Sequence, residues 1–205
     1  MSFSPRSTSL STNRSTPPTC SPWPTSPRSQ SRPAASAFWG HYLDYNFYDQ
    51  PKVWETIGGS IKQQFGEENS CAARASYALN YGGAPIPFIP QFDTNLNLPS
   101  AGGDGKRYIV SASKFRCYLR YVWGSPDYEW GVGKAIENIT QLRDKFPKPG
   151  FAVAIVGWRV PRGFGHVAVI TPDYDEQNAV HPPGLDYSKA EPMPGAGVGW
   201  VWILT

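Results

Sequence analysis

The chain has 205 residues and a formal net charge of +3 at pH 7, which fits one domain with an appendage. No basic patch stands out in the sequence, so we expect no nucleic-acid partner. No apolar run approaches the roughly 18 residues of a membrane-spanning helix, so we expect no membrane association.

Residues 1–37 have the composition of a disordered tail. They hold eleven Ser, five Thr, seven Pro and four Arg, and neither Asp nor Glu. Such a segment buries too little apolar surface to offset the entropy that it loses on ordering. It also lacks the apolar run of a secretory signal peptide. We therefore predict a disordered tail over residues 1–37 and a folded domain over residues 38–205.

The domain opens with an aromatic segment followed by a helical pattern. Residues 38–50 predict an extended lead-in packed on the domain, with His41 in packing or at the surface. Gly58 and Gly59 weaken the helix that follows by roughly 1 kcal/mol each relative to Ala, and they suggest close packing against a neighbour. That helix is predicted by apolar side chains at every fourth position: Val53, Ile57, Ile61 and Phe65.

Residues 69–83 predict a capped helix over about residues 70–81, around which we expect the fold to be organised. Asn69 or Ser70 can cap its start, and Gly82 or Gly83 can close its end. One stripe of small side chains suits packing against a sheet: Ala72, Ala75, Ser76 and Leu79. Cys71 lies in the first turn, where N–H groups and the helix dipole favour a thiolate. This predicts a nucleophile, with a small buried apolar residue as the alternative interpretation.

The rest of the chain predicts two more helices and then a sheet. Tyr108 begins a short strand to residue 110, and a helix runs from Ser111 or Ser113 to Gly124, with Cys117 in a structural role beside its core face. A further helix covers residues 132–142. Predicted strands follow at residues 151–158, 166–171, 179–181 and 200–204. Helices first and an antiparallel sheet second indicate an α+β domain.

The three cysteines, Cys20, Cys71 and Cys117, form neither a disulfide framework nor a metal-ligand spacing. A bridge between Cys71 and Cys117 would consume the nucleophile. We expect no metal and no cofactor.

A cysteine nucleophile needs a base within hydrogen-bond reach and a third group that orients the base. His166 begins a predicted strand after a Gly-Phe-Gly segment, so its side chain can project from the sheet toward a helix N-terminus packed there. An isolated strand histidine is more often an ordinary hydrogen-bonded residue. Cys71 on an early helix together with His166 in a later hairpin predicts a papain-like pair.

Several blocks of the sequence occur in an order typical of one protein family. They are Ile57-Gly-Gly59, the stretch from Asn69 to Asn80, Ile86-Pro87, Gly102-Gly-Asp-Gly105, Tyr108 to Leu119, and Gly165-His-Val167. In these blocks the chain resembles the fourth family of type VI secretion amidase effectors. The resemblance spans about residues 53–204.

This resemblance implies an NlpC-like, papain-like fold and cleavage of the γ-D-glutamyl to diaminopimelate bond in peptidoglycan stem peptides. It implies Cys71 as the nucleophile and His166 as the general base, with backbone N–H groups near the helix start, including that of Cys71, holding the oxyanion. The family places an Asp shortly after this histidine, which favours Asp173 as the third catalytic residue. Asp175 and His181 stay open as alternatives.

The resemblance also implies a toxin that is delivered into the periplasm of a rival bacterium, with the stem peptide as substrate and an immunity protein as an inhibitory partner. Two other functions stay open. The first is a general NlpC-type cell-wall peptidase without a toxin role. The second is an inactive relative that binds glycan or peptide through some of its eight Trp and eleven Tyr.

Overall fold

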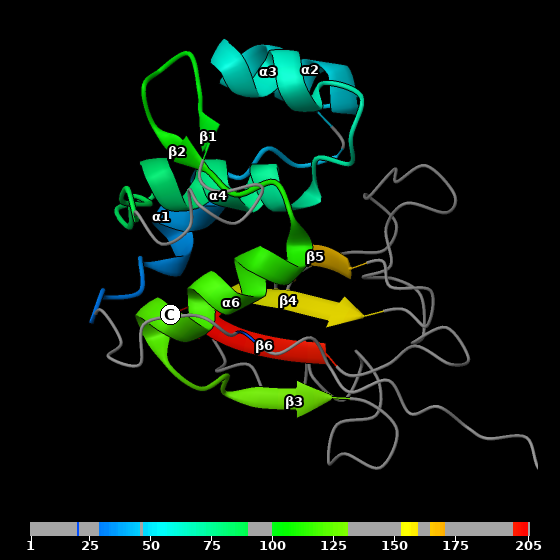
Figure 1. The fold of residues 1–205 in the computed structure, drawn as a ribbon. Coiled ribbons are helices and arrows are strands. Elements are labelled where there is room, and N and C mark those ends of the chain that lie inside the picture. Colours follow the sequence, from blue (N-terminus) through cyan, green and yellow to red (C-terminus); the bar gives the residue numbers. More distant parts are fainter. Residues whose placement is uncertain are drawn as a thin grey trace, which may run out of the picture.

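The computed structural model describes residue 20 and residues 29–45, 47–89, 100–130, 153–159, 165–170 and 199–204. Helix α4, Cys71–Tyr81, lies between two layers. Helices α2, Gln50–Ile57, and α3, Gly59–Phe65, lie on one side of α4, and a four-stranded antiparallel sheet lies on the other (Figure 1). Helices and an antiparallel sheet in one unit make an α+β fold, which confirms the predicted fold class.

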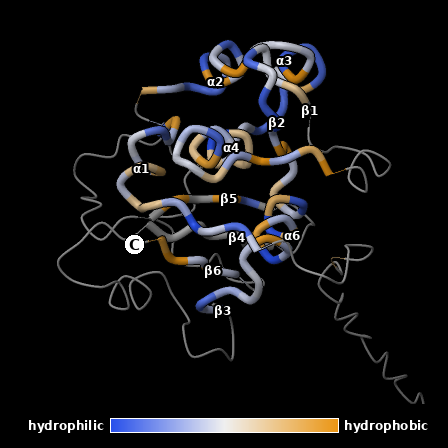
Figure 2. Tube along the Cα trace, turned by 90° about the vertical axis from the view of Figure 1, so that its left-hand side faces the viewer, coloured by the Kyte–Doolittle hydropathy of each residue, from blue (hydrophilic) through white to orange (hydrophobic). Residues whose placement is uncertain are grey.

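Helices α2 and α3 replace the single helix predicted from the apolar repeat. The helix is interrupted at Gly58 and Gly59, which take φ angles of 62° and 66°. Glycine adopts this region without a steric penalty, so the pair ends one helix and starts the next. A Cβ on Gly59 would lie 2.4 Å from the Gly103 nitrogen, which confirms the predicted close packing. Hydrophobic residues recur among hydrophilic ones along both helices, as expected for helices with one buried face (Figure 2).

Helix α4 is the central element, and its predicted range is confirmed. Nine of its 11 residues are buried, so both of its faces lie in a core. Ala72, Ala75 and Leu79 pack in the larger cluster, which includes strand residues of the sheet. Ala73 packs on the opposite side with the apolar residues of α2 and α3. Small side chains let both layers approach the helix closely.

The sheet has the strand order β3-β6-β4-β5, with antiparallel neighbours. Its strands are β3, Tyr128–Trp130, β4, Val153–Arg159, β5, Gly165–Ile170, and β6, Gly199–Leu204. The antiparallel prediction is confirmed for β4, β5 and β6, whereas β3 was not predicted. The predicted helix over residues 132–142 and the strand over residues 179–181 lie outside the described residues.

Two further elements cover the flanks. Helix α6, Ala112–Trp123, has the predicted range and packs on the sheet. Strands β1, Ser100–Ala101, and β2, Arg107–Tyr108, form a two-stranded ribbon next to α3, so the short strand predicted at Tyr108 is present but shifted. None of the helices in the described part of the chain is long and apolar enough to cross a membrane.

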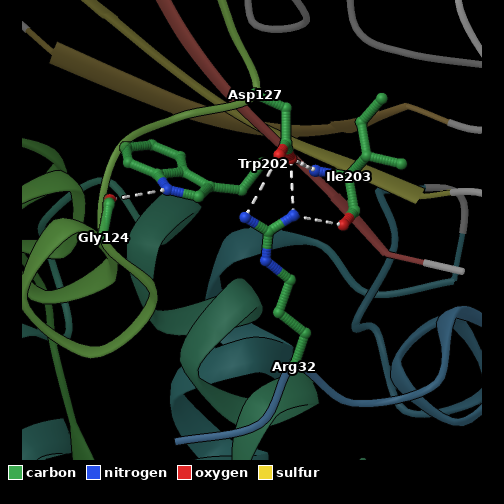
Figure 3. A network of polar contacts seen from close by, with 5 residues as sticks. All are labelled: Arg32, Gly124, Asp127, Trp202 and Ile203. Carbon is green, nitrogen blue, oxygen red and sulfur yellow. Dashed lines mark hydrogen bonds and ion pairs between the residues drawn. The ribbon is translucent and has the colours of Figure 1, made fainter. Parts of the chain in front are cut away.

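Residues 29–37 differ from the disordered tail that composition predicts. Helix α1, Ala35–Gly40, starts inside this segment, where the chain was also predicted to continue as an extended lead-in. Arg32 reaches Asp127 and the Ile203 carbonyl, at 2.5 Å and 2.8 Å, and so ties the segment to β6 (Figure 3). The segment is ordered by a few specific contacts, which an average over 37 residues does not reveal. Residues 1–19 and 21–28 lie outside the described residues.

The cysteines also pair differently from the prediction. A disulfide joins Cys20 to Cys117 on α6, with a Cα–Cα distance of 5.4 Å across a sequence separation of 97 residues. Cys117 is therefore structural, as predicted, but through a bridge that the cysteine spacing did not indicate. Cys71 is left as the free thiol.

Candidate active site

Cys71 is the first residue of α4, and its backbone fixes the start of the helix. The Asn69 side-chain oxygen accepts a hydrogen bond of 2.9 Å from the Cys71 N–H, so Asn69 provides the side-chain cap. Ser70 holds the N-cap position, but its hydroxyl accepts from Arg74 Nε at 3.0 Å. The Cys71 N–H, which we expected to help hold an oxyanion, is thus engaged by Asn69 in this structure.

The Cys71 thiol is buried, with 3% of the residue exposed. Burial raises the pKa of the thiol and outweighs the groups that lower it, of which the Val167 backbone N–H has the largest effect. The N–H groups of Ala72 and Cys71 and the charge of Arg74 also lower the pKa. The predicted effect of the helix start is therefore present, but the net shift is upward because desolvation is stronger.

Cys71 and Val167 lie in one buried cluster, and the Val167 backbone N–H is a group that lowers the pKa of the thiol, so the thiol lies near the part of β5 that carries His166. The Val167 nitrogen is bonded to the carbonyl carbon of His166, so the thiol lies near the peptide bond that joins these two residues. Strand β5 is an edge strand of the described sheet, and its Val167 shares a buried apolar cluster with Cys71. The structure thus brings Cys71 and the backbone of His166 together.

The His166 side chain is also buried, with 4% of the residue exposed. Val167 and Val169 point into the core shared with α4, so alternation along β5 turns His166 toward the other face of the sheet. The approach of the His166 ring to the Cys71 sulfur stays a prediction.

The other candidate residues fall elsewhere or are not described. His41 lies at the end of α1, where its ring contacts Tyr81, 5.8 Å between centroids. Tyr81 ends α4, and a helix rises about 1.5 Å per residue, so His41 lies far from Cys71. Asp173, Asp175 and His181 lie outside the described residues, so the third catalytic residue stays a prediction.

Arg74 is a site neighbour that the sequence analysis missed. It lies one turn after Cys71 and is buried, with 1% exposed. The available signal was a single charged residue within a run of small residues that predicts a buried helix. A charge in that position must be hydrogen-bonded inside the fold.

The Gly102–Gly105 block has a structural role at the opposite end of α4. Asp104 accepts hydrogen bonds from the hydroxyls of Tyr81 and Tyr108, at 2.8 Å and 2.6 Å, and from the Lys106 N–H at 2.9 Å. Burial and the hydrogen bond with Asp104 raise the pKa of Tyr81 to about 12. This block fixes the turn that packs against Gly59 and is separate from the thiol. Among the residues that the structure describes, no three His, Cys, Asp or Glu side chains form a group that could hold a metal ion.

No protein-family model and no curated protein sequence matches the chain. Solved structures with a similar fold include the type VI effector Tae4 from Enterobacter cloacae, with a TM-score of 0.58 and 21% identity over 86% of this chain and 99% of that chain. The Tae4–Tai4 complex from Enterobacter cloacae matches with a TM-score of 0.59 and 23% identity, over 85% of this chain and 100% of that chain. A third match is the effector Tae4 from Salmonella typhimurium, solved in complex with the immunity Tai4 from Enterobacter cloacae. Its TM-score is 0.56 and its identity 24%, over 85% of this chain and 100% of that chain. The chain therefore shares the fold of these Tae4 effectors.

Proposed function

We propose that the chain is a cysteine amidase that hydrolyses the γ-D-glutamyl to diaminopimelate bond of peptidoglycan stem peptides and acts as an antibacterial effector. The observation that carries the proposal is the position of the Cys71 thiol, at the start of α4 and in one buried cluster with Val167, the residue after His166. The fold shared with Tae4 and the sequence resemblance to the amidase effectors support it. We assign the α+β fold to the NlpC-like, papain-like class on the same grounds.

In the proposed mechanism the Cys71 proton moves to the His166 ring, and the thiolate attacks the amide carbonyl carbon. A base is needed because burial raises the pKa of the thiol and favours its neutral form. His166 then gives the proton to the leaving amine and later activates the water that hydrolyses the thioester. Backbone N–H groups at the start of α4 hold the oxyanion, and that of Cys71 joins them by exchanging Asn69 for the substrate oxygen.

We propose Asp173 as the group that orients the His166 ring, with Asp175 and His181 as the alternatives. Removing the true orienting group should lower kcat strongly while leaving the thiol and the fold in place. The variants Asp173→Asn, Asp175→Asn and His181→Ala, assayed in parallel, therefore identify it. Loss of activity in Asp175→Asn or His181→Ala alone would reassign the role.

We also propose that the protein acts in the periplasm of a target bacterium and that an immunity protein inhibits it. Tae4 from Enterobacter cloacae and Tae4 from Salmonella typhimurium have each been solved in a complex with Tai4, which supports such a partner. Growth arrest on periplasmic but not cytoplasmic expression favours the toxin role. Sacculus cleavage without growth arrest in the periplasm would instead favour a general cell-wall peptidase.

The decisive experiment is digestion of purified Gram-negative sacculi, followed by chromatography and mass analysis of the muropeptides. Wild type should release stem peptides cut after D-glutamate. Cys71→Ala and His166→Ala should release at least about 1,000-fold less, because losing the nucleophile or its base removes the covalent pathway.

His41→Ala is the matched control, since it removes a histidine at the far end of α4 and should keep full activity. Full activity in Cys71→Ala would overturn the proposed nucleophile. No new product from folded wild type with a reduced Cys71 would point to a different amide or to a binding relative.

A further inference from the structure

Arg74 is a buried cation held by a fixed set of neutral acceptors. Its Nη1 donates to the Leu43 and Tyr48 carbonyls at 2.6 Å and 2.7 Å. Its Nε donates to the Ser70 hydroxyl at 3.0 Å. These bonds join α4 to the segment before α2 and hold the guanidinium in one place.

Within the part of the chain that the structure describes, these hydrogen bonds of Arg74 all go to neutral oxygen atoms. The Arg74 guanidinium carbon lies 3.8 Å from the centroid of the Tyr45 ring, and this cation–π contact brings no negative charge. A buried charge without a charged partner is costly. Groups in such surroundings cluster at functional sites, and the candidate for a negative charge on the same helix is the Cys71 sulfur.

Cys71 and Arg74 stand at positions i and i+3 of α4, and side chains with this spacing lie on the same face, with Cβ atoms about 5–6 Å apart. The Arg74 charge lowers the pKa of the Cys71 thiol, in opposition to burial. Other titratable or charged groups stand on the elements around α4: His166 on β5, Asp44, Tyr45 and Tyr48 before α2, Glu67 and Glu68 before α4, Tyr108 on β2 and Arg116 on α6. Among the groups of the described residues that change the pKa of the thiol, Arg74 is the charged side chain.

We propose that Arg74 is a positioning residue whose fixed, buried charge stabilises the Cys71 thiolate that forms when the proton passes to His166. No other atom moves in this step: the S–H bond breaks, the electron pair stays on sulfur, and the histidine ring gains the proton. The inference rests on the proposed function for the identity of the nucleophile. It goes further, because it separates the charge of Arg74 from its role in linking two segments.

Two variants separate the charge from the hydrogen bonds. Arg74→Lys keeps the charge but loses the planar arrangement of donors. Arg74→citrulline keeps one N–H and one terminal NH2, enough for the bonds to Ser70, Leu43 and Tyr48, and replaces the other NH2 with a neutral oxygen. Both proteins are first compared with wild type by urea unfolding, which reports the linking role alone.

The measurement is the rate of Cys71 alkylation by iodoacetamide between about pH 6 and pH 11, followed by mass spectrometry of the oxidised protein. Cys20 and Cys117 form a disulfide, so Cys71 is the free thiol and the alkylation rate reports on Cys71 alone. The thiolate reacts and the thiol does not, so the reaction rate follows the pKa of Cys71. Loss of a nearby positive charge raises the pKa of a thiol, and one pKa unit is a tenfold change in the thiolate fraction well below the pKa. We expect the citrulline variant to react about tenfold more slowly near neutral pH, with its profile moved to higher pH, and Arg74→Lys to stay near wild type.

A citrulline variant whose profile keeps the wild-type midpoint would overturn the proposal, whatever the lysine variant does. The reverse order, with Arg74→Lys impaired and citrulline normal, would assign Arg74 to linking alone. Peptidoglycan is not involved in this assay, so it stays informative if the substrate assignment fails. The proposed function fails separately, through persistent sacculus cleavage by Cys71→Ala.

Discussion

The Cys20–Cys117 disulfide should supply a large part of the stability of the domain. The two cysteines are separated by 97 residues. The loop-closure entropy that a crosslink removes from the unfolded chain is worth about 4.7 kcal/mol for a loop of about 100 residues. Cys117 is buried on α6, so the bridge acts between the N-terminal segment and the core. We expect reduction, or the substitution Cys20→Ala, to cost about 2–5 kcal/mol.

Equilibrium urea unfolding of oxidised wild type, reduced wild type and Cys20→Ala measures this contribution. All three proteins should carry Cys71→Ala, so that no third thiol exchanges with the bridge. Peptide mapping without reductant must show the Cys20–Cys117 peptide pair in the oxidised sample. Equal free energies of unfolding in the oxidised protein and Cys20→Ala would refute the argument from loop closure.

Three further predictions concern the core and the thiol. Burial raises the pKa of Cys71, so the neutral thiol stabilises the fold below the pKa of an unfolded cysteine, about 8.5. This contribution is lost as the pH rises through the pKa of the folded protein. In urea unfolding, wild type should therefore lose stability relative to Cys71→Ala above about pH 8.5. Gly59→Ala should cost at least about 2 kcal/mol by thermal unfolding, from positive φ and backbone overlap, whereas Gly40→Ala should change little because its Cβ meets open space. Ser76→Ala should cost about 2 kcal/mol in urea unfolding, because its buried hydroxyl bonds both backbone groups of Ile109 at 3.1 Å.

Helix α4 was predictable because several local signals agree over a short stretch. Asn69 caps it, a stripe of small residues defines its buried face, and glycines follow its end at Gly82. The helix at residues 53–65 was predicted as one piece because periodicity reports the buried face and not the backbone angle. Only the positive φ of Gly58 and Gly59 shows that the face is carried by two helices.

Features that depend on distant contacts were not predictable from pattern. The partner of Cys117 is set by the folded position of residue 20, which cysteine spacing does not contain. Residues 29–37 are ordered through contacts such as Arg32 with Asp127, and these are too few to alter the segment's composition.

For the candidate site as well, features that depend on local sequence were predictable and features that depend on distant contacts were not. Cys71 was predicted from its place on a helix and His166 from its place on a strand, and the structure has them on α4 and β5. Cys71 and Val167, the residue after His166, lie in one buried cluster. The direction of the Cys71 pKa shift was not readable, because helix position is a sequence property whereas burial depends on the packed fold. Arg74 was missed because a charge in a helix normally faces solvent.

Burial of Cys71 and bridging of the other two cysteines solve one chemical problem together. Disulfides form in oxidising compartments such as the periplasm, where a free thiol is exposed to exchange and oxidation. Exchange requires an accessible thiolate, and Cys71 is buried, with a raised pKa that reduces its thiolate fraction. Cys20 and Cys117 can therefore pair while Cys71 stays reduced. The burial that protects the thiol also makes it a weak nucleophile until its proton is removed. This is the reason for the roles that we propose for His166 as base and Arg74 as fixed charge.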